Sequence, residues 1–192
     1  KYSSNILRMI ENEPTLLNSF HFLLEYPELL SFKIRSSYFR RKMKERLNGG
    51  YRLNLRVDRK NLLTTSFRSF RNKSTDDLLR RFRVDFRNED EIDLDGPTRE
   101  WFTELAKEIF NQNYGLFDCS IDKKCYKPSN LSSINPNHLD YFKFAGQFIA
   151  RALIQGQCVD AHLTTSFCKQ ILHRELNLID IEDADEQLYQ NL

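Results

Sequence analysis

Apolar side chains recur at helical spacing along most of the chain, which predicts a largely helical protein. In the first thirty residues Pro14 and Pro27 interrupt this spacing and divide it into two short helices. Over residues 31–47 apolar side chains return every four positions, as expected for an amphipathic helix. The Asn-Gly-Gly run at 48–50 follows, and we expect the helix to end there because glycine is typical just past a helix.

Alternating apolar and polar residues predict two strands, at 53–57 and 82–86. Between them a helix is expected around Phe67, and Ser74 is suited to cap a shorter helix because its hydroxyl can accept from a free backbone N–H. So few strands among so many helices predict an α+β fold that is predominantly helical.

A further helix is expected to begin at Pro97, since proline lacks the N–H that a first turn leaves unpaired. Its apolar stripe comprises six residues: Trp101, Phe102, Leu105, Ala106, Ile109 and Phe110. Residues 111–133 are interpreted as an irregular segment with short strands.

The longest predicted helix starts at Asn135-Pro136 and stops at Gly156. Most of its residues are apolar, so we expect it to lie at the centre of the core. After it, Thr164 or Thr165 should cap another helix, and three apolar residues of that helix are expected to be buried: Phe167, Ile171 and Leu172.

Charge is divided unevenly along the chain of 192 residues, although the net charge is only +2. Residues 33–87 hold 18 Lys or Arg and 5 Asp or Glu, whereas residues 88–192 hold 9 and 18. A solvated or protein-docking surface is the favoured interpretation of the basic half, because most of its basic residues are expected on the polar faces of helices that bury the interleaved rings of Tyr38, Phe39 and Tyr51. Nucleic-acid binding is the alternative, and it predicts affinity that falls steeply with salt.

The four cysteines offer little for catalysis or metal binding. Cys125 is the best candidate nucleophile because nearby lysines favour a thiolate, but no histidine lies near it in sequence. A disulfide between Cys119 and Cys125 is geometrically possible, while the unpaired spacing favours thiols of the cytosol or nucleus. Cys158 and Cys168 are expected in the core. Cys158 and His162 share metal-ligand spacing, yet a zinc site needs a second such pair, so no metal and no cofactor are predicted.

Arg99 and Glu100 stand at the start of a predicted helix, beside the acidic segment 89–95. General acid or base catalysis there would need a converging histidine or second polar cluster, which the sequence does not offer. A structural ion pair with carboxylates of the acidic segment is therefore the favoured interpretation.

Two aromatic-rich blocks stand in a fixed order. The first joins Arg-Glu-Trp-Phe at 99–102, Ile-Phe-Asn at 109–111 and Tyr-Gly-Leu-Phe at 114–117; the second is Ile-Asn-Pro-Asn-His-Leu-Asp-Tyr-Phe-Lys-Phe-Ala-Gly at 134–146. Together they resemble the large subdomain of the amino-terminal lobe of HECT-type ubiquitin ligases, and within that family the very large ligases of the Tom1 and Mule type. One departure is Asp95, which takes the place of a glycine in the family's Asp-x-Gly-Gly pattern.

The resemblance implies a helical lead-in at 1–32 and a partial HECT domain at 33–192. In that family a cysteine after a threonine, in a second lobe, receives ubiquitin as a thioester from a conjugating enzyme and passes it to substrate lysines. This chain ends at Leu192 and contains no Thr-Cys pair, so it is expected to be the scaffold part, with no catalytic residue and no thioester of its own.

The resemblance also suggests partners and a compartment. Ubiquitin, a conjugating enzyme, the catalytic lobe and protein substrates are the expected partners, in the cytoplasm, the nucleus or both, without membrane contact. By analogy, Tyr114, Leu116 and Phe117 are candidates for a noncovalent ubiquitin contact, although Leu116 and Phe117 are equally suited to packing on the core. The alternative to a ligase scaffold is a non-catalytic module that binds proteins, ubiquitin among them.

Overall fold

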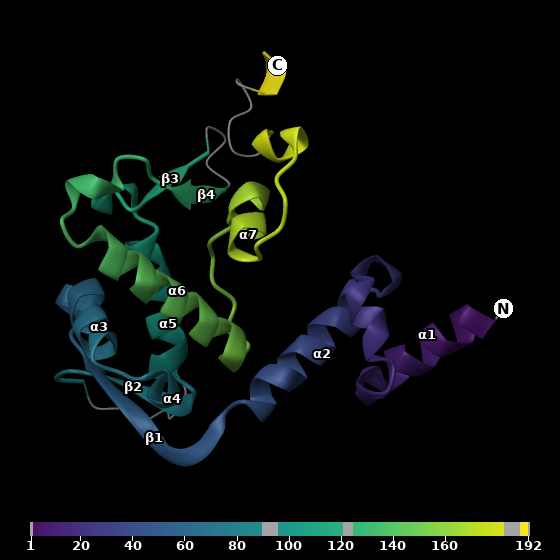
Figure 1. Ribbon diagram of the computed structural model, residues 1–192. Helices are drawn as coiled ribbons and strands as arrows, with labels where there is room; N and C mark the ends of the chain where they lie inside the picture. Colours follow the sequence, from purple (N-terminus) through teal and green to yellow (C-terminus); the bar gives the residue numbers. More distant parts are fainter. Residues whose placement is uncertain (1, 90–95, 121–124, 183–188, 192) are drawn as a thin grey trace.

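The computed structural model describes residues 2–89, 96–120, 125–182 and 189–191. It has an elongated helical lead-in beside a larger body, as Figure 1 shows. The body is mostly helical with two pairs of short strands, so the predicted helix-dominated α+β class is confirmed. Outside the described residues lie positions 90–95 of the acidic segment, Asp95 among them, and the two lysines Lys123 and Lys124.

The lead-in has its own small core. Its elements are one α-helix, three short 3₁₀-helices and a second α-helix: α1 (Tyr2–Asn12), η1 (Pro14–Asn18), η2 (His21–Glu25), η3 (Pro27–Leu29) and α2 (Phe32–Glu45). Pro14 and Pro27 each begin a 3₁₀-helix. In place of the two short helices predicted, the structure therefore has one α-helix followed by short 3₁₀-helices. The core consists of five side chains: Ile10, Leu17, Leu23, Leu30 and Ile34. It therefore extends past residue 32 into α2.

The Asn-Gly-Gly run after α2 plays a different part from the one predicted. Helix α2 already ends at Glu45, and residues 48–50 begin strand β1 (Asn48–Val57). β1 pairs in parallel with β2 (Arg80–Phe86), in a register that runs from Leu53 opposite Phe82 to Val57 opposite Phe86. A parallel pair needs a crossover connection, which is supplied by η4 (Arg59–Asn61), α3 (Leu62–Arg71) and α4 (Thr75–Leu78). Ser74 caps α4 as predicted, in a capping box with Asp77.

Aromatic rings fill the main core, where α3, α5 (Gly96–Ile109) and α6 (His138–Gln155) pack over the two strands (Figure 1). Trp101 is fully buried, and four rings lie 4.9–5.9 Å from it: Phe70, Phe82, Phe102 and Phe148. Its indole N–H donates to Ser66 Oγ at 2.9 Å, which satisfies the one polar group of the ring. The predicted stripe of α5 is buried in full.

Helix α6 is less uniformly buried than predicted. Phe148 is fully buried, but Leu139 is 71% and Leu153 50% exposed, so one face of α6 meets solvent. Gly156 ends the helix as predicted, with φ of 67°, a conformation that favours glycine. The described helices include none long and apolar enough to cross a membrane.

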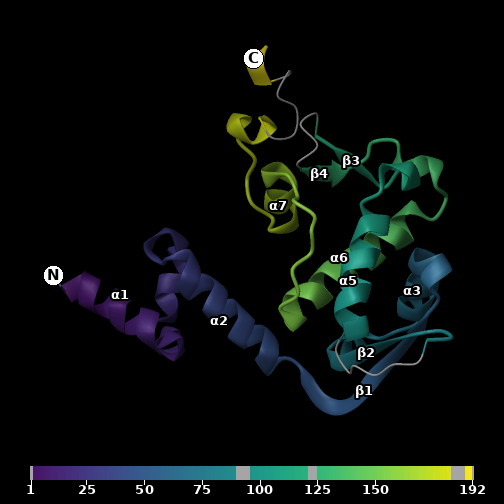
Figure 2. The ribbon, with the colours of Figure 1, turned by 180° about the vertical axis from the view of Figure 1, so that it is seen from behind.

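The far end of the body holds an antiparallel pair, β3 (Phe117–Cys119) and β4 (Tyr126–Pro128), beside η5 (Gln112–Tyr114), η6 (Ser132–Ile134), α7 (Thr165–Ile171) and η7 (Leu178–Ile181). Figure 2 shows this end from behind. Thr164 caps α7 by accepting from Phe167 N at 3.3 Å. The prediction that α7 buries three apolar residues is wrong for two of them, because Ile171 is 52% and Leu172 64% exposed.

Candidate functional site

The Tyr-Gly-Leu-Phe loop turns one ring outward and two side chains inward. Asn111 starts the turn by accepting from Asn113 N at 3.0 Å, and Gly115 follows η5 with φ of 65°. Beyond this left-handed residue the chain enters the core, where Leu116 is 1% and Phe117 2% exposed. Tyr114, in contrast, is 43% exposed. Of the three candidate contact residues, only Tyr114 therefore offers its side chain to another molecule.

Core packing explains the burial of Phe117. Its ring lies 4.8 Å from that of Phe110 and 5.3 Å from that of Phe142, so it joins α5 to α6. Turning it outward would open the aromatic core, at a cost of roughly 3–5 kcal/mol. Phe117 thus positions the loop.

The loop of Tyr114 is joined to a segment that carries exposed apolar side chains and leads into α6. Partial burial, followed by the nearby Glu108 and Tyr141, raises the pKa of the Tyr114 phenol, so the ring remains neutral at physiological pH. Ser129 N donates to Leu116 O at 2.9 Å and ties the loop to the segment that leads into α6. Three strongly exposed apolar residues belong to that segment and the first turn of α6, and we call them the apolar rim: Leu131, Ile134 and Leu139.

A second polar centre lies where the parallel strands end. Arg59 donates to both carboxylate oxygens of Glu89, at 2.7 and 2.9 Å, and to both of Glu100, at 2.7 and 3.1 Å. Its guanidinium also stacks 4.2 Å from the Phe86 ring. The hydrogen bonds that Arg59 donates to the two glutamates raise the pKa of Arg59, and Arg59 in turn lowers the pKa of Glu89.

These distances identify Glu100 as a member of a structural ion pair, joining η4, the end of β2 and the start of α5. The sequence interpretation predicted an ion pair with carboxylates of the acidic segment, whereas Glu100 pairs with Arg59, which also binds Glu89 of that segment. Nothing in the local sequence pattern marks Arg59, because the pairing depends on strands that meet only in the folded chain. Glu89 accepts hydrogen bonds from a permanent cation that lowers its pKa, so Glu89 is unsuited to act as a general acid.

Comparison with known proteins agrees with the aromatic blocks. The HECT-domain (ubiquitin-transferase) family matches residues 103–192. The chain is 35% identical over 189 residues to the E3 ubiquitin-protein ligase ptr1 of Schizosaccharomyces pombe, covering 96% of this chain and 6% of that protein. The chain belongs to the HECT family.

Other HECT relatives match along almost the whole chain. E3 ubiquitin-protein ligase HUWE1 of Mus musculus is 32% identical over 207 residues, covering 99% of this chain and 5% of the mouse protein. E3 ubiquitin-protein ligase TOM1 of Saccharomyces cerevisiae is 33% identical over 189 residues, covering 96% and 6%. The resemblance to the Tom1 and Mule type is thus confirmed, and the chain spans about a twentieth of the length of these relatives.

The cysteines of this HECT chain are thiols, and all four lie in described parts of the structure. Cys158 is exposed, so its predicted place in the core is wrong, while Cys119, Cys125 and Cys168 are partly buried. In the described residues no group of three or more His, Cys, Asp and Glu is placed to hold a metal ion, and Cys158 with His162 gains no further ligand.

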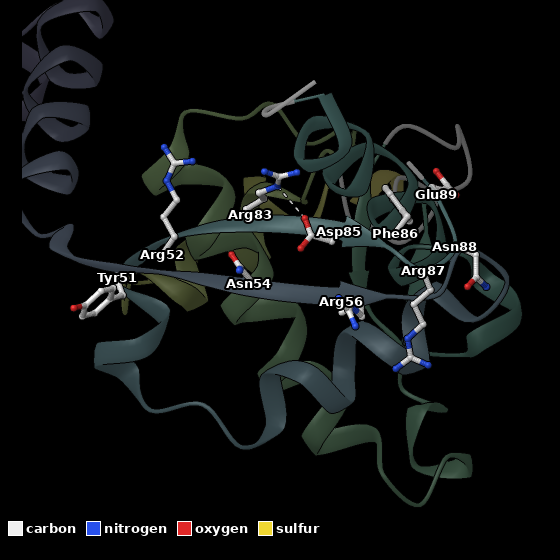
Figure 3. A pocket seen from close by; sticks show the side chains of 10 residues that line it. All are labelled: Tyr51, Arg52, Asn54, Arg56, Arg83, Asp85, Phe86, Arg87, Asn88 and Glu89. Carbon is white, nitrogen blue, oxygen red and sulfur yellow. Dashed lines mark hydrogen bonds and ion pairs between the residues drawn. The ribbon is translucent and has the colours of Figure 1, made fainter. Parts of the chain in front are cut away.

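The basic half of the HECT chain gathers partly on a strand surface rather than only on helices. The outward side chains of β1 and β2 line an open hollow of about 1120 Å³, shown in Figure 3. Of its two aromatic lining residues, Tyr51 is 91% exposed and Phe86 is buried, and on α2 Phe39 is 42% exposed. The interpretation that the basic residues cover helices which bury these rings is therefore wrong for Tyr51 and Phe39.

Proposed function

We propose that this chain is scaffold from a HECT-type ubiquitin ligase, which receives ubiquitin from a conjugating enzyme as a cysteine thioester and transfers it to substrate lysines. The observation that carries this proposal is similarity to E3 ubiquitin-protein ligases over 96% or more of the chain. Ubiquitin, a conjugating enzyme and protein substrates follow as the general kinds of partner.

The proposed role of the chain is to hold reacting groups in place. Thioester transfer requires a thiolate within van der Waals distance of the thioester carbonyl, so a rigid support and a mobile nucleophile suit the reaction. The interlocked rings around Trp101 supply rigidity. We propose that none of the four cysteines is the nucleophile, since none follows a threonine.

Within this function, Tyr114 and the apolar rim are proposed to contact ubiquitin noncovalently. Support comes from the exposure of Tyr114 and from the hydrogen bond that joins its loop to the segment with exposed apolar side chains, which are typical of protein-binding surfaces. Leu116 and Phe117 would act indirectly, by fixing the loop.

The proposed organisation keeps a helical extension at 1–32 and a partial HECT domain at 33–192. Cytoplasmic or nuclear residence is proposed as well, because thiols persist in reducing compartments. Fluorescence microscopy of the tagged full-length protein would test this, and a secreted product would contradict it.

A thioester assay tests the ligase proposal. The full-length protein should form a ubiquitin adduct that a thiol reductant removes when activating enzyme, conjugating enzyme and ubiquitin are present. The 192-residue chain alone should form none under the same conditions. A reducible adduct on one of its cysteines would contradict the scaffold role, and a full-length protein unable to form any adduct would favour the non-catalytic binding module.

Ubiquitin binding tests the Tyr114 surface. Tyr114→Ala should weaken binding of isotope-labelled ubiquitin about fivefold or more in an NMR titration, because the largest outward ring of the loop is lost. Tyr26→Ala, which removes another exposed ring (52%) in the lead-in, is the matched control and should leave binding unchanged. Equal effects of the two variants would exclude the proposed site.

A further inference from the structure

The outward face of the parallel strand pair carries charges that the fold does not use. Leu55 and Val84 point into the main core, so the alternate residues of each strand point away from it. Together with Tyr51 and the residues that follow β2, these outward residues form what we call the basic sheet face: Arg52, Asn54, Arg56, Arg83, Asp85, Arg87, Asn88 and Glu89 (Figure 3).

Two carboxylates on this face are already occupied. Asp85 accepts from Arg83 Nε at 2.9 Å, the pair marked in Figure 3. Glu89 is held by Arg59 at 2.7 Å. The other three guanidinium groups, of Arg52, Arg56 and Arg87, are exposed and form no ion pair with a residue in the described part of the chain. These three cations of the basic sheet face are therefore available to bind another molecule.

The type and spacing of these cations indicate what they fit. All four cations of the face are arginine, whose planar fork matches a carboxylate in a bidentate pair, while lysine acts as a point charge. Arg52 and Arg56 lie on one side of a strand, about 13 Å apart, the distance between side chains four residues apart in any extended peptide. Arg87 is near Arg56, because Arg87 N donates to Val57 O at 2.8 Å where the strands end.

We propose that the basic sheet face binds an extended acidic segment of a partner polypeptide, with Asp or Glu side chains at alternate positions. Charge complementarity selects this occupant, and the exposed ring of Tyr51 offers an apolar contact to the residues between the acidic ones. A nucleic acid fits less well, because its continuous phosphates would lie against Asp85 and Glu89. This proposal is independent of the ligase function.

Fluorescence anisotropy with the 192-residue chain tests the proposal. The probe is a short dye-labelled peptide in which Glu alternates with Thr. Replacing Arg52, Arg56 and Arg87 together by Ala should weaken its binding about tenfold or more, because three exposed charge pairs are lost. The matched control replaces three other exposed arginines, Arg8, Arg35 and Arg40, by Ala, with the same change in net charge, and should leave affinity within about twofold.

Further measurements test whether binding depends on the shape of the arginine side chain and on the class of partner, or only on charge. Replacing the same three arginines of the face by Lys should weaken binding measurably, since the charge remains but the fork is lost. A single-stranded DNA of equal charge should bind less tightly than the peptide. The proposal is overturned if the peptide does not bind, if the control variant loses as much affinity, if the Lys variant binds as tightly as the original, or if DNA binds more tightly. Light scattering gives the association state of the chain, and the proposal is also overturned if only a self-associated form binds the peptide.

Discussion

Arg151 brings a charge into the main core without a carboxylate beside it in the described residues. The side chain is 1% exposed, and Nη1 donates to Leu78 O at 2.7 Å. The guanidinium lies 4.4 Å from the Phe82 ring, while Nε and Nη2 find no hydrogen-bond partner among the residues that the structure describes. Burial lowers the pKa of Arg151 to about 10. The sequence predicts that Arg151 points into the core, because residues 144, 148 and 151 share one helical face. It does not predict that Arg151 has no carboxylate partner among the described residues.

Arg151→Met should either stabilise the protein or destabilise it by no more than about 1 kcal/mol. Met keeps most of the volume and removes the desolvated charge, against the loss of one hydrogen bond. The folded-state pKa of about 10 is below the ordinary value of an arginine, so the unfolded state binds more protons between the two pKa values and stability rises with pH there. The charge penalty is thus fully present at neutral pH, where urea unfolding should be measured.

Arg151→Ala is the comparison, and it should lose about 2–4 kcal/mol because it leaves a cavity as well. If Arg151→Met also lost more than about 3 kcal/mol, the guanidinium would have to be paired in solution. Either result reports on the charge rather than on side-chain volume.

Tyr114 is a candidate contact residue by analogy with the HECT family, and local sequence explains only its surroundings. The left-handed Gly115 shows why the two residues after it turn inward. Arg59 and the basic sheet face depend on β1 lying beside β2, which alternation within each strand cannot reveal. The alternation does predict which side of each strand is polar, and the structure adds that the two polar sides form one surface.

At the scale of the elements, the burial of a helix is predicted best where other elements cover most of its surface. Helix α5 packs against both the strands and α6, so its full apolar stripe is buried as expected. Helix α7 lies at the edge of the body, where apolar spacing alone overestimates burial. For α6 the abundance of apolar residues predicts a helix at the centre of the core, whereas one face of the helix is exposed. Sequence patterns identify elements better than they identify neighbours.

Helix α6 offers a matched pair of substitutions. Phe148→Ala should cost roughly 3–5 kcal/mol, because the fully buried ring lies 5.6 Å from both Trp101 and Phe102 and leaves a cavity that these rings cannot fill. Leu139→Ala, on the exposed face of the same helix, should change stability by less than about 0.5 kcal/mol. Denaturant melts measure both. A loss below about 1 kcal/mol for Phe148→Ala would mean that α6 is not held by this core.

At the scale of the whole molecule, α2 connects the two cores: it packs against α6 and continues into β1. The lead-in core has five buried apolar residues, and the main core has many more. Figure 1 shows α2 extending from the body, with α1 at its far side. A small core buries too little apolar surface for high stability, so the lead-in should open before the body does.

The single tryptophan makes this separation measurable. Trp101 lies in the main core, so its fluorescence follows the body, while far-ultraviolet circular dichroism follows the helices of both parts. The two probes should give different urea midpoints, with the dichroism change beginning first. Leu17→Ala, in the lead-in core, should shift only that early change, since the cavity forms where Trp101 does not report. Coincident midpoints, moved together by Leu17→Ala, would show instead that the lead-in and the body unfold as one cooperative unit.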